Sequence, residues 1–430
     1  MYSPFQWARQ TVGGRQIETD GSRLINFYAV RPANEQESKV PVIIYGSPGY
    51  RRFAEVPPET FTRNTVPITP DPGIHGLIET NTAADGQHLI GISSEYQLFD
   101  IEIGPLSQDM APDYNPFEPP AALFQLATPR IHNYTTEDSE KATGPLRMAT
   151  DGRYVMFVSR RVVHCYDVRN ARFVPVVAPL PDNINANLPD EEWVDVVWSD
   201  GYFILLARSG QFYHSNQGQI TFDQLDYSTA ETSPDPSVGM KVLGRQLFIF
   251  GTDSIEVWYN AGSPVATPTF AYQRNNGLSR DYGCANIDTL QATKEQILFV
   301  TPENAVWSIT PTGNMRHEST DWVEELIKQS DSERARAFVY YEEGHWFYVL
   351  ILTNPDDTRH GVALDLATGL WHERTQTDVL CCQRFRNRNL IGREGSPYLA
   401  ALDLNFSTAD GVVIERTAIA PILHLSLIHI

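Results

Sequence analysis

Seven stretches of the chain share one pattern: a half-apolar segment, a tight polar turn, a very apolar segment, a second turn and an amphipathic segment. The clearest copy, VGMKVLGRQLFIFGTDSIEVWYNAG, begins at Val238 and has its first turn at Gly244-Arg245. Asp200-Gly201 and Asp151-Gly152 occupy the same turn in other copies, where glycine accepts a positive φ without steric cost. Short apolar runs bounded by such turns predict strands joined by hairpins, and therefore an all-β chain.

The spacing of the most apolar segments indicates how these units assemble. The segments begin near Leu89, Tyr154, Tyr202, Leu247, Ile297, Trp346 and Asn389. Their successive separations are 65, 48, 45, 50, 49 and 43 residues, and all but the first suit a propeller blade of about 40–50 residues. A fourth, outer strand per unit is expected. A solenoid has the same period, but ring closure protects the strand edges, so we expect a seven-bladed β-propeller. The weak end copies leave six or eight blades open.

The chain divides into three expected parts. Residues 1–73 do not follow the repeat, and we expect an N-terminal extended arm with a propeller-closing segment. Residues 74–424 form the propeller, with the Pro-rich stretch from Gly104 to Pro120 as an inserted loop. Ser319-Thr320-Asp321 offers N-cap oxygens before WVEELIKQ, which predicts a helix between the fifth and sixth units.

Charge and cysteine usage narrow the function classes. The formal net charge of −20 repels phosphate, which argues against adhesion to DNA as the main activity. It also predicts a largely monomeric isolated chain that oligomerises on a template. No cysteine has C-x-x-C spacing, so we expect Cys165, Cys284, Cys381 and Cys382 to be buried and reduced. The first residues, MYSPFQWARQ, predict no signal peptide, and no apolar run is long enough for a membrane helix.

Catalytic motifs such as G-x-S-x-G, a Walker loop or H-E-x-x-H are absent from the sequence, so we expect no enzymatic activity, cofactor or metal. His345, after Glu342-Glu343-Gly344, could form a carboxylate–histidine relay, but a polar hairpin tip is favoured. Asp356-Asp357 could bind a cation, but lacks the pattern of a calcium loop and is expected to be a solvated turn. Four tryptophans fall on repeat strands and are expected in the core rather than on a sugar-binding rim. They are Trp258, Trp307, Trp346 and Trp371.

The segment RFRNRN carries the densest positive charge of the chain, at Arg384, Arg386 and Arg388, with Arg393 nearby. Within one strand, alternate residues point to the same face, so the first three arginines are expected to form one basic face. They are the candidate partner-binding residues, for an acidic partner or a phosphate backbone. A solvated sheet face is the alternative.

Several segments resemble the tail-hub, or packaged-DNA stabilisation, proteins of short-tailed bacteriophages. They are LINFYAVRP from Leu24, PVIIYGSPGYRRF from Pro41, FDQLDYSTAET from Phe222, VLGRQLFIFGTDSIEVWYNAG and RNNGLSRDYG from Arg274. The resemblance spans about Leu24 to Leu423. It implies a structural virion protein, made in the host cytoplasm, that docks below the portal and helps to close or extend the DNA exit channel. The implied partners are the portal, other tail proteins and further copies in a ring, with packaged DNA passing nearby without sequence-specific binding and no membrane.

A propeller module, secreted or cytosolic, that binds or hydrolyses glycans is the alternative function. It would need an arginine cluster, paired carboxylates and a tyrosine that converge on the ring centre, and the sequence shows no such set. Portal and terminase genes beside this gene would favour the phage protein.

The last six residues, LSLIHI from Leu425 to Ile430, resemble a translated transposase sequencing adapter. We therefore expect residues 425–430 to be a non-native tail fused after about His424. The preceding VVIERTAIAPIL resembles a strand that leads into a further C-terminal β domain, so the natural protein is expected to be longer.

Overall fold

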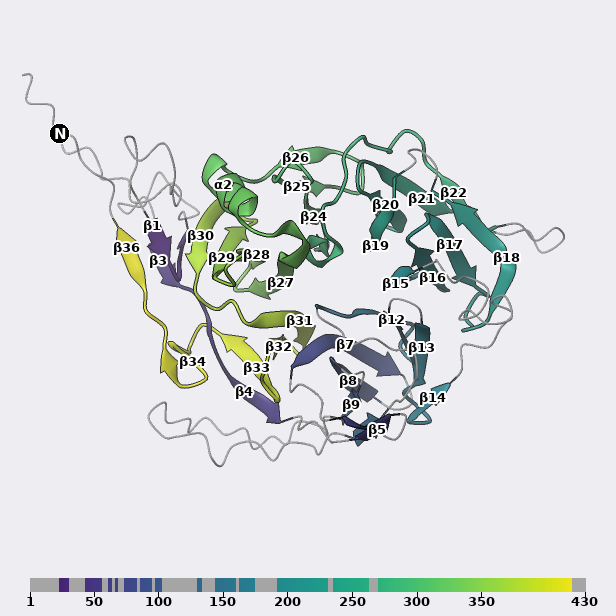
Figure 1. Cartoon of the computed structure of the whole chain (residues 1–430), viewed down its shortest axis with the longest axis horizontal. Helices are drawn as coiled ribbons and strands as arrows, with labels where there is room; N and C mark the ends of the chain where they lie inside the picture. Colours follow the sequence, from purple (N-terminus) through teal and green to yellow (C-terminus); the bar gives the residue numbers. More distant parts are fainter. Residues whose placement is uncertain are drawn as a thin grey trace, which may run out of the picture.

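A computed structural model shows seven sheets arranged around a central channel, with each sheet forming one blade of a ring (Figure 1). The structure describes residues 23–30, 43–55, 61–63, 66–68, 73–82, 86–94, 97–102, 130–133, 144–159, 162–174, 192–230, 235–262 and 270–419. The all-β prediction and the count of seven blades are confirmed. The Pro-rich stretch from Gly104 to Pro120 and the segment 425–430 lie outside the described residues.

Each blade is an antiparallel sheet of four strands, ordered from the channel outward. Blade 1 contains β7 (Ile74–Thr82), β8 (Gly86–Ser93), β9 (Gln97–Glu102) and β10 (Arg130–Asn133). Blade 2 contains β11 (Arg147–Thr150), β12 (Tyr154–Ser159), β13 (Val162–Asp167) and β14 (Arg172–Val174). Blade 3 contains β15 (Trp193–Ser199), β16 (Tyr202–Ala207), β17 (Gln211–Ser215) and β18 (Phe222–Thr229). Blade 4 contains β19 (Ser237–Leu243), β20 (Gln246–Gly251), β21 (Ile255–Asn260) and β22 (Tyr272–Arg274).

The remaining blades follow the same order, except that the last takes its outer strand from the N-terminal part of the chain. Blade 5 contains β23 (Gln291–Ala292), β24 (Ile297–Val300), β25 (Val306–Ile309) and β26 (Met315–His317). Blade 6 contains β27 (Arg336–Glu342), β28 (His345–Thr353), β29 (Arg359–Asp365) and β30 (Leu370–Arg374). Blade 7 contains β31 (Val379–Phe385), β32 (Arg388–Arg393), β33 (Tyr398–Asp403) and β4 (Gly49–Glu55). All seven predicted central segments fall on the second strand of a blade.

The first turn of several blades shows why the sequence folds into hairpins there. In blade 3, Asp200 and Gly201 have φ of 48° and 92°, and in blade 4, Gly244 and Arg245 have φ of 58° and 65°. Two successive residues with positive φ make a turn whose twist matches that of the flanking strands. The second strands are buried on both faces, as the run from Phe203 to Ala207 illustrates, because a neighbouring blade covers each face.

Strand β4 closes the ring by joining distant parts of the chain. It pairs antiparallel with β33, with Tyr50 opposite Leu402 and Ala54 opposite Leu399, and Figure 1 shows the purple β4 beside the yellow β33. The other strands outside the blades are β1 (Arg23–Ile25), β2 (Phe27–Val30), β3 (Ile43–Gly46), β5 (Phe61–Arg63), β6 (Val66–Ile68), β34 (Thr408–Ala409), β35 (Val412–Val413) and β36 (Thr417–Ile419). Strand β1 lies between β30 and β36 and so extends blade 6.

Helix α2 (Asp321–Gln329) lies between blades 5 and 6, as predicted, and buries Val323 and Ile327 in the core between them. The expected capping is wrong in detail, because Thr320 is the N-cap residue and makes no side-chain capping hydrogen bond. The Ser319 hydroxyl instead accepts from the Val306 amide at 3.0 Å and so ties the helix start to β25. Two short 3₁₀ helices, η1 (Ile287–Thr289) and η2 (Ser332–Arg334), precede blades 5 and 6. No helix among the described residues is long and apolar enough to cross a membrane.

Acid should destabilise this fold through buried histidines. Burial lowers the pKa of His164 to about 3 and that of His372 well below its ordinary value. The unfolded chain therefore binds more protons below about pH 6.5, so stability falls as the pH drops from there towards the folded-state pKa. Each such histidine contributes up to about 1.4 kcal/mol of lost stability per pH unit.

Thermal unfolding between pH 7 and 4 tests this expectation. His164 stacks on Phe157 with ring centroids 4.8 Å apart, so His164→Phe keeps an aromatic ring at the site. The variant should show a shallower loss of Tm with acid than the wild type, whatever its Tm at neutral pH. An identical slope in both proteins would contradict the prediction.

Candidate functional site

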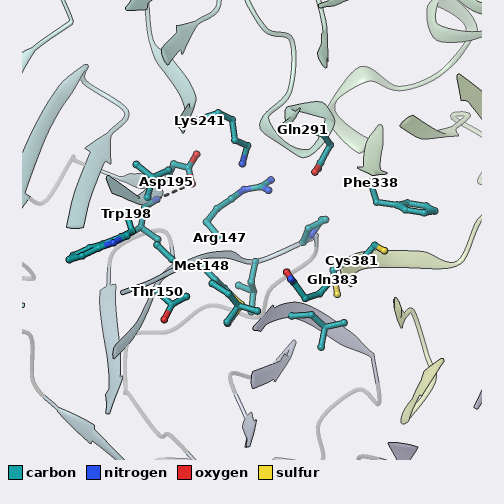
Figure 2. A pocket seen from close by; sticks show the side chains of 18 of the residues that line it. Arg147, Met148, Thr150, Asp195, Trp198, Lys241, Gln291, Phe338, Cys381 and Gln383 are labelled. Carbon is teal, nitrogen blue, oxygen red and sulfur yellow. Dashed lines mark hydrogen bonds between the residues drawn. The ribbon is translucent and has the colours of Figure 1, made fainter. Parts of the chain in front are cut away.

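The innermost strands of all seven blades enclose a cavity of about 470 Å³ at the centre of the ring. Apolar side chains such as Ile78, Val197, Val242 and Phe338 form part of its wall, and polar groups contribute about as much of the exposed lining. Three charged residues line the same space: Arg147 on β11, Asp195 on β15 and Lys241 on β19 (Figure 2). Charged groups that converge among apolar side chains in a concave wall are a feature of ligand-binding pockets.

Arg147 forms an ion pair with Asp288, which lies on η1 at the entrance to blade 5. The side chains of both residues are mostly buried, at 11% and 21% exposure. Burial raises the pKa of Asp288, and Arg147, Arg336 and Lys241 oppose that shift. The pair therefore connects blade 2 with blade 5 across the channel.

Asp195 and Lys241 are neighbours in the channel but do not form an ion pair. Asp195 is 1% exposed, and its two carboxylate oxygens accept hydrogen bonds from the amides of Val196 and Met240, each at 2.9 Å. Burial lowers the pKa of Lys241, and the negative charge of Asp195 opposes the shift. Asp195 thus connects blade 3 to blade 4 through the Met240 amide.

Sequence reasoning missed these channel charges. Arg147, Asp195 and Lys241 each stand in the first, half-apolar segment of a repeat copy, which the ring turns towards its centre. A charged residue inside an otherwise apolar first strand could have indicated a side chain that faces the channel. The repeat pattern of the sequence did not indicate that Arg147, Asp195 and Lys241 lie in the same cavity.

The three candidate arginines do not share one strand face, so that prediction is wrong. Arg384 lies near the end of β31, Arg386 is in the turn with φ of 45°, and Arg388 begins β32. A two-residue turn at Arg386-Asn387, where Asn387 has φ of 64°, interrupts the alternation that the prediction assumed. The three side chains still belong to one hairpin tip, hereafter the arginine hairpin, made of Arg384 to Arg388.

The arginine hairpin packs against the first turns of the two neighbouring blades. The Arg384 guanidinium lies 4.6 Å from the centre of the Tyr341 ring in blade 6. The Arg386 Nε donates to the Gln87 Oε1 in blade 1 at 3.0 Å. Asn389 donates to Glu342 at 2.9 Å, and burial raises the pKa of Glu342 to about 6. The Glu342 carboxylate of blade 6 is therefore held by Asn389, directly after the arginine hairpin.

His345 meets a carboxylate that the sequence did not suggest. Its Nδ1 lies 2.8 Å from Asp365 Oδ2, whereas Glu343 and Gly344 form the hairpin tip with φ of 44° and 91°. Asp365 is 1% exposed and also accepts from the Ala367 amide and the Thr368 hydroxyl, both at 2.9 Å. The pair braces the turn between β29 and β30.

Asp356 and Asp357 lie in the turn between β28 and β29. Asp356 accepts from the amide and the hydroxyl of Thr358, at 3.1 and 2.6 Å, and Asp357 pairs with Arg334 at 2.7 Å. Among the described residues, no group of three or more His, Cys, Asp or Glu side chains could hold a metal ion.

The tryptophans belong to the packing of the blades. Trp371 is 1% exposed and donates to the Glu318 carbonyl at 2.8 Å, and Trp258 donates to Glu256 at 2.9 Å. The prediction of a core position is confirmed for these two. Trp307 packs against the core between blades 4 and 5, and Trp346 is partly exposed beside Tyr341.

The cysteines are free, but two are not fully buried as expected. Cys165 and Cys284 lie in the interior. Cys381 and Cys382 are half-buried because they stand on β31, whose inner position exposes both to the channel. The apolar surroundings raise the pKa of Cys284 to about 11 and that of Cys381 to about 12, so these thiols stay protonated at neutral pH.

Several solved structures resemble the chain in overall shape. They include the computationally designed Ika8 protein (11% identity, TM-score 0.42, 81% of this chain and 99% of that one) and BBS1N in complex with ARL6DN (10%, 0.44, 84% and 99%). A chain of the mitotic checkpoint complex is similar at 10% identity and TM-score 0.44, with 81% of this chain and 95% of that one covered. No curated protein matches the chain.

A family model described as the β-propeller of bacteriophage P22 Gp10 matches residues 140–359, which is just over half of the chain. The match begins before blade 2 and extends into blade 6, so it rests on the propeller itself. The resemblance to phage stabilisation proteins noted in the sequence is thereby confirmed. The chain belongs to the phage stabilisation family represented by the β-propeller of bacteriophage P22 Gp10.

Proposed function

We propose that this protein is a structural component of the phage tail or head-completion complex, which docks below the portal and helps to close or extend the DNA exit channel. In that position it would help to retain the packaged DNA. The family match over the propeller is the observation that carries this proposal. The proposed location is the tail of the virion, after synthesis in the host cytoplasm.

The propeller channel is not the proposed path of the DNA. Its volume of about 470 Å³ falls in the range of small-molecule pockets, about 300–1,000 Å³. Duplex DNA, whose major groove alone is about 12 Å wide, needs far more space. The DNA path would lie between several copies of the protein arranged in a ring. The net charge of −20 suits a wall past which DNA slides without adhering.

We also propose that the protein has no turnover of its own. Asp195 lines the channel and accepts two backbone amides, and Asp288 pairs with Arg147, which lines the same space. Glycoside hydrolysis requires one carboxyl group as proton donor and a second as base or nucleophile, and both of these carboxylates are already engaged.

The arginine hairpin is the proposed contact with a ring-shaped partner such as the portal. Changing Arg384, Arg386 and Arg388 to Glu should weaken docking at least tenfold, because a basic contact becomes acidic on an already acidic protein. The three side chains are half-buried, and Arg384 and Arg386 contact neighbouring blades, so a modest loss of stability is expected. A thermal melt of the triple variant checks that it is folded before its docking is compared. Sedimentation or electron microscopy of the protein mixed with its cognate portal measures the docking.

A control with the same change of charge separates a specific contact from general repulsion. Arg172, Arg208 and Arg245 are exposed and lie on blades 2, 3 and 4, away from the arginine hairpin. Their triple change to Glu should leave docking nearly intact. Equal loss in both triple variants, or no loss in either, would remove the arginine hairpin as the contact.

A further inference from the structure

We propose that Arg147 and Lys241 form a binding site for a small oxyanion inside the central channel of the propeller. The ligand class is a phosphate or carboxylate group held between blades 2 and 4. The site does not depend on the proposed docking to the portal.

Both cations keep unused hydrogen-bond donors in the channel. Lys241 has three N–H donors, and among the described residues its ammonium has no hydrogen-bond or ion-pair partner. Arg147 has five N–H donors and makes one hydrogen bond, to Asp288. Both side chains line the cavity, and Figure 2 shows their charged ends directed into the same space. A half-buried ammonium without a partner is unusual, because leaving water costs free energy that a counter-charge normally offsets.

The nearby carboxylates do not fill this role. Asp195 uses one oxygen for the Val196 amide and the other for the Met240 amide, which holds its carboxylate against the backbone. Asp288 is engaged by Arg147. Asp195 attracts Lys241 through space without touching it, so an additional anion at the Lys241 ammonium would supply the missing contact.

The cavity selects for a small ligand. A volume of about 470 Å³ accommodates a small molecule, and the partial burial of Arg147 and Lys241 strengthens their attraction for an anion. The remainder of the protein, at a net charge of −20, repels polyanions. A single phosphate or carboxylate group fits these limits better than a nucleic acid strand.

Isothermal titration calorimetry of the full chain with inorganic phosphate, at constant ionic strength in chloride, tests the site. Phosphate should bind with one-to-one stoichiometry and raise Tm, because a ligand that binds only the folded state stabilises it. Lys241→Met removes the ammonium and keeps a long apolar side chain, so affinity should fall at least tenfold. Lys294→Met, at the exposed turn between β23 and β24, is the matched control and should bind phosphate like the wild type.

Two further experiments distinguish phosphate from carboxylate ligands and separate loss of charge from loss of the fold. Competition by acetate would assign the site to carboxylates as well, whereas binding of phosphate alone would assign it to phosphate groups. Lys241→Arg keeps the positive charge and should retain most of the binding, which separates loss of charge from loss of fold. The inference is overturned if chloride and phosphate act alike on the wild type, or if phosphate binds equally well to Lys241→Met.

Discussion

Placing a carboxylate on the closing strand should open the ring: we expect Ala54→Asp to lower the free energy of unfolding by about 3–5 kcal/mol, the usual effect of an uncompensated buried charge. Ala54 is 3% exposed on β4 and packs with Ile74, Leu77 and Leu399. The same substitution also weakens the pairing of β4 with β33, because an aspartate opposite Leu399 has no polar partner there. Chemical denaturation measures the loss.

Limited proteolysis distinguishes an opened ring from a general loss of stability. In Ala54→Asp, cleavage should begin in the N-terminal segment that carries β4, before the blades are cut. Ala261→Asp is the control, because Ala261 is exposed beyond β21, and its stability should change by no more than about 0.5 kcal/mol. A variant Ala54→Asp that is as stable and as protease-resistant as the wild type would show that β4 is not needed for closure.

The second large effect is expected at the junction of blades 5 and 6. Trp371 fills the core formed by β24, β25, helix α2 and the strands of blade 6, together with Val323 and Leu350. Trp371→Ala should reduce the free energy of unfolding by about 3–5 kcal/mol, because a large cavity replaces the ring and the Glu318 carbonyl loses its donor.

Trp346→Ala provides the comparison for this effect within the same blade. Trp346 is partly exposed, with its ring 5.2 Å from that of Tyr341. Its removal leaves no closed cavity, so Trp346→Ala should lower the free energy of unfolding by less than half as much as Trp371→Ala. Urea unfolding of the two variants measures both values. Equal losses would mean that the core at α2 does not hold blades 5 and 6 together.

A buried asparagine provides a second connection between the two ends of the propeller, in addition to the pairing of β4 with β33. Asn26, in the segment LINFYAVRP, lies fully buried with φ of 57°, a conformation that asparagine tolerates better than most residues. Its side-chain amide donates to Thr375 Oγ1 at 2.9 Å and to the Glu415 carbonyl at 2.7 Å. Asn26 therefore connects the N-terminal strands with blade 6 and with the C-terminal segment, in addition to the pairing of β4.

The sequence by itself determined the repeating unit of this protein. The hairpin turns at Asp200-Gly201 and Gly244-Arg245 could be predicted because a positive φ depends on the residue and its immediate neighbours. The second strand of each blade could be predicted because a strand covered on both faces is apolar throughout. Length and period then indicated seven blades. Helix α2 was predicted from the segment Ser319-Thr320-Asp321 before WVEELIKQ, which is also a local signal, although Thr320 makes no side-chain capping hydrogen bond.

Only the tertiary structure decided which distant residues meet. Arg384, Arg386 and Arg388 separate over a hairpin because a two-residue turn interrupts the strand, and His345 pairs with Asp365 twenty residues away rather than with Glu342 or Glu343 beside it. Arg147 and Lys241 reach one cavity because the closed ring turns the inner strands of every blade towards its centre. A repeat pattern specifies each blade from local interactions, whereas the contacts between blades depend on how the whole ring closes, and no short segment of the sequence contains that information.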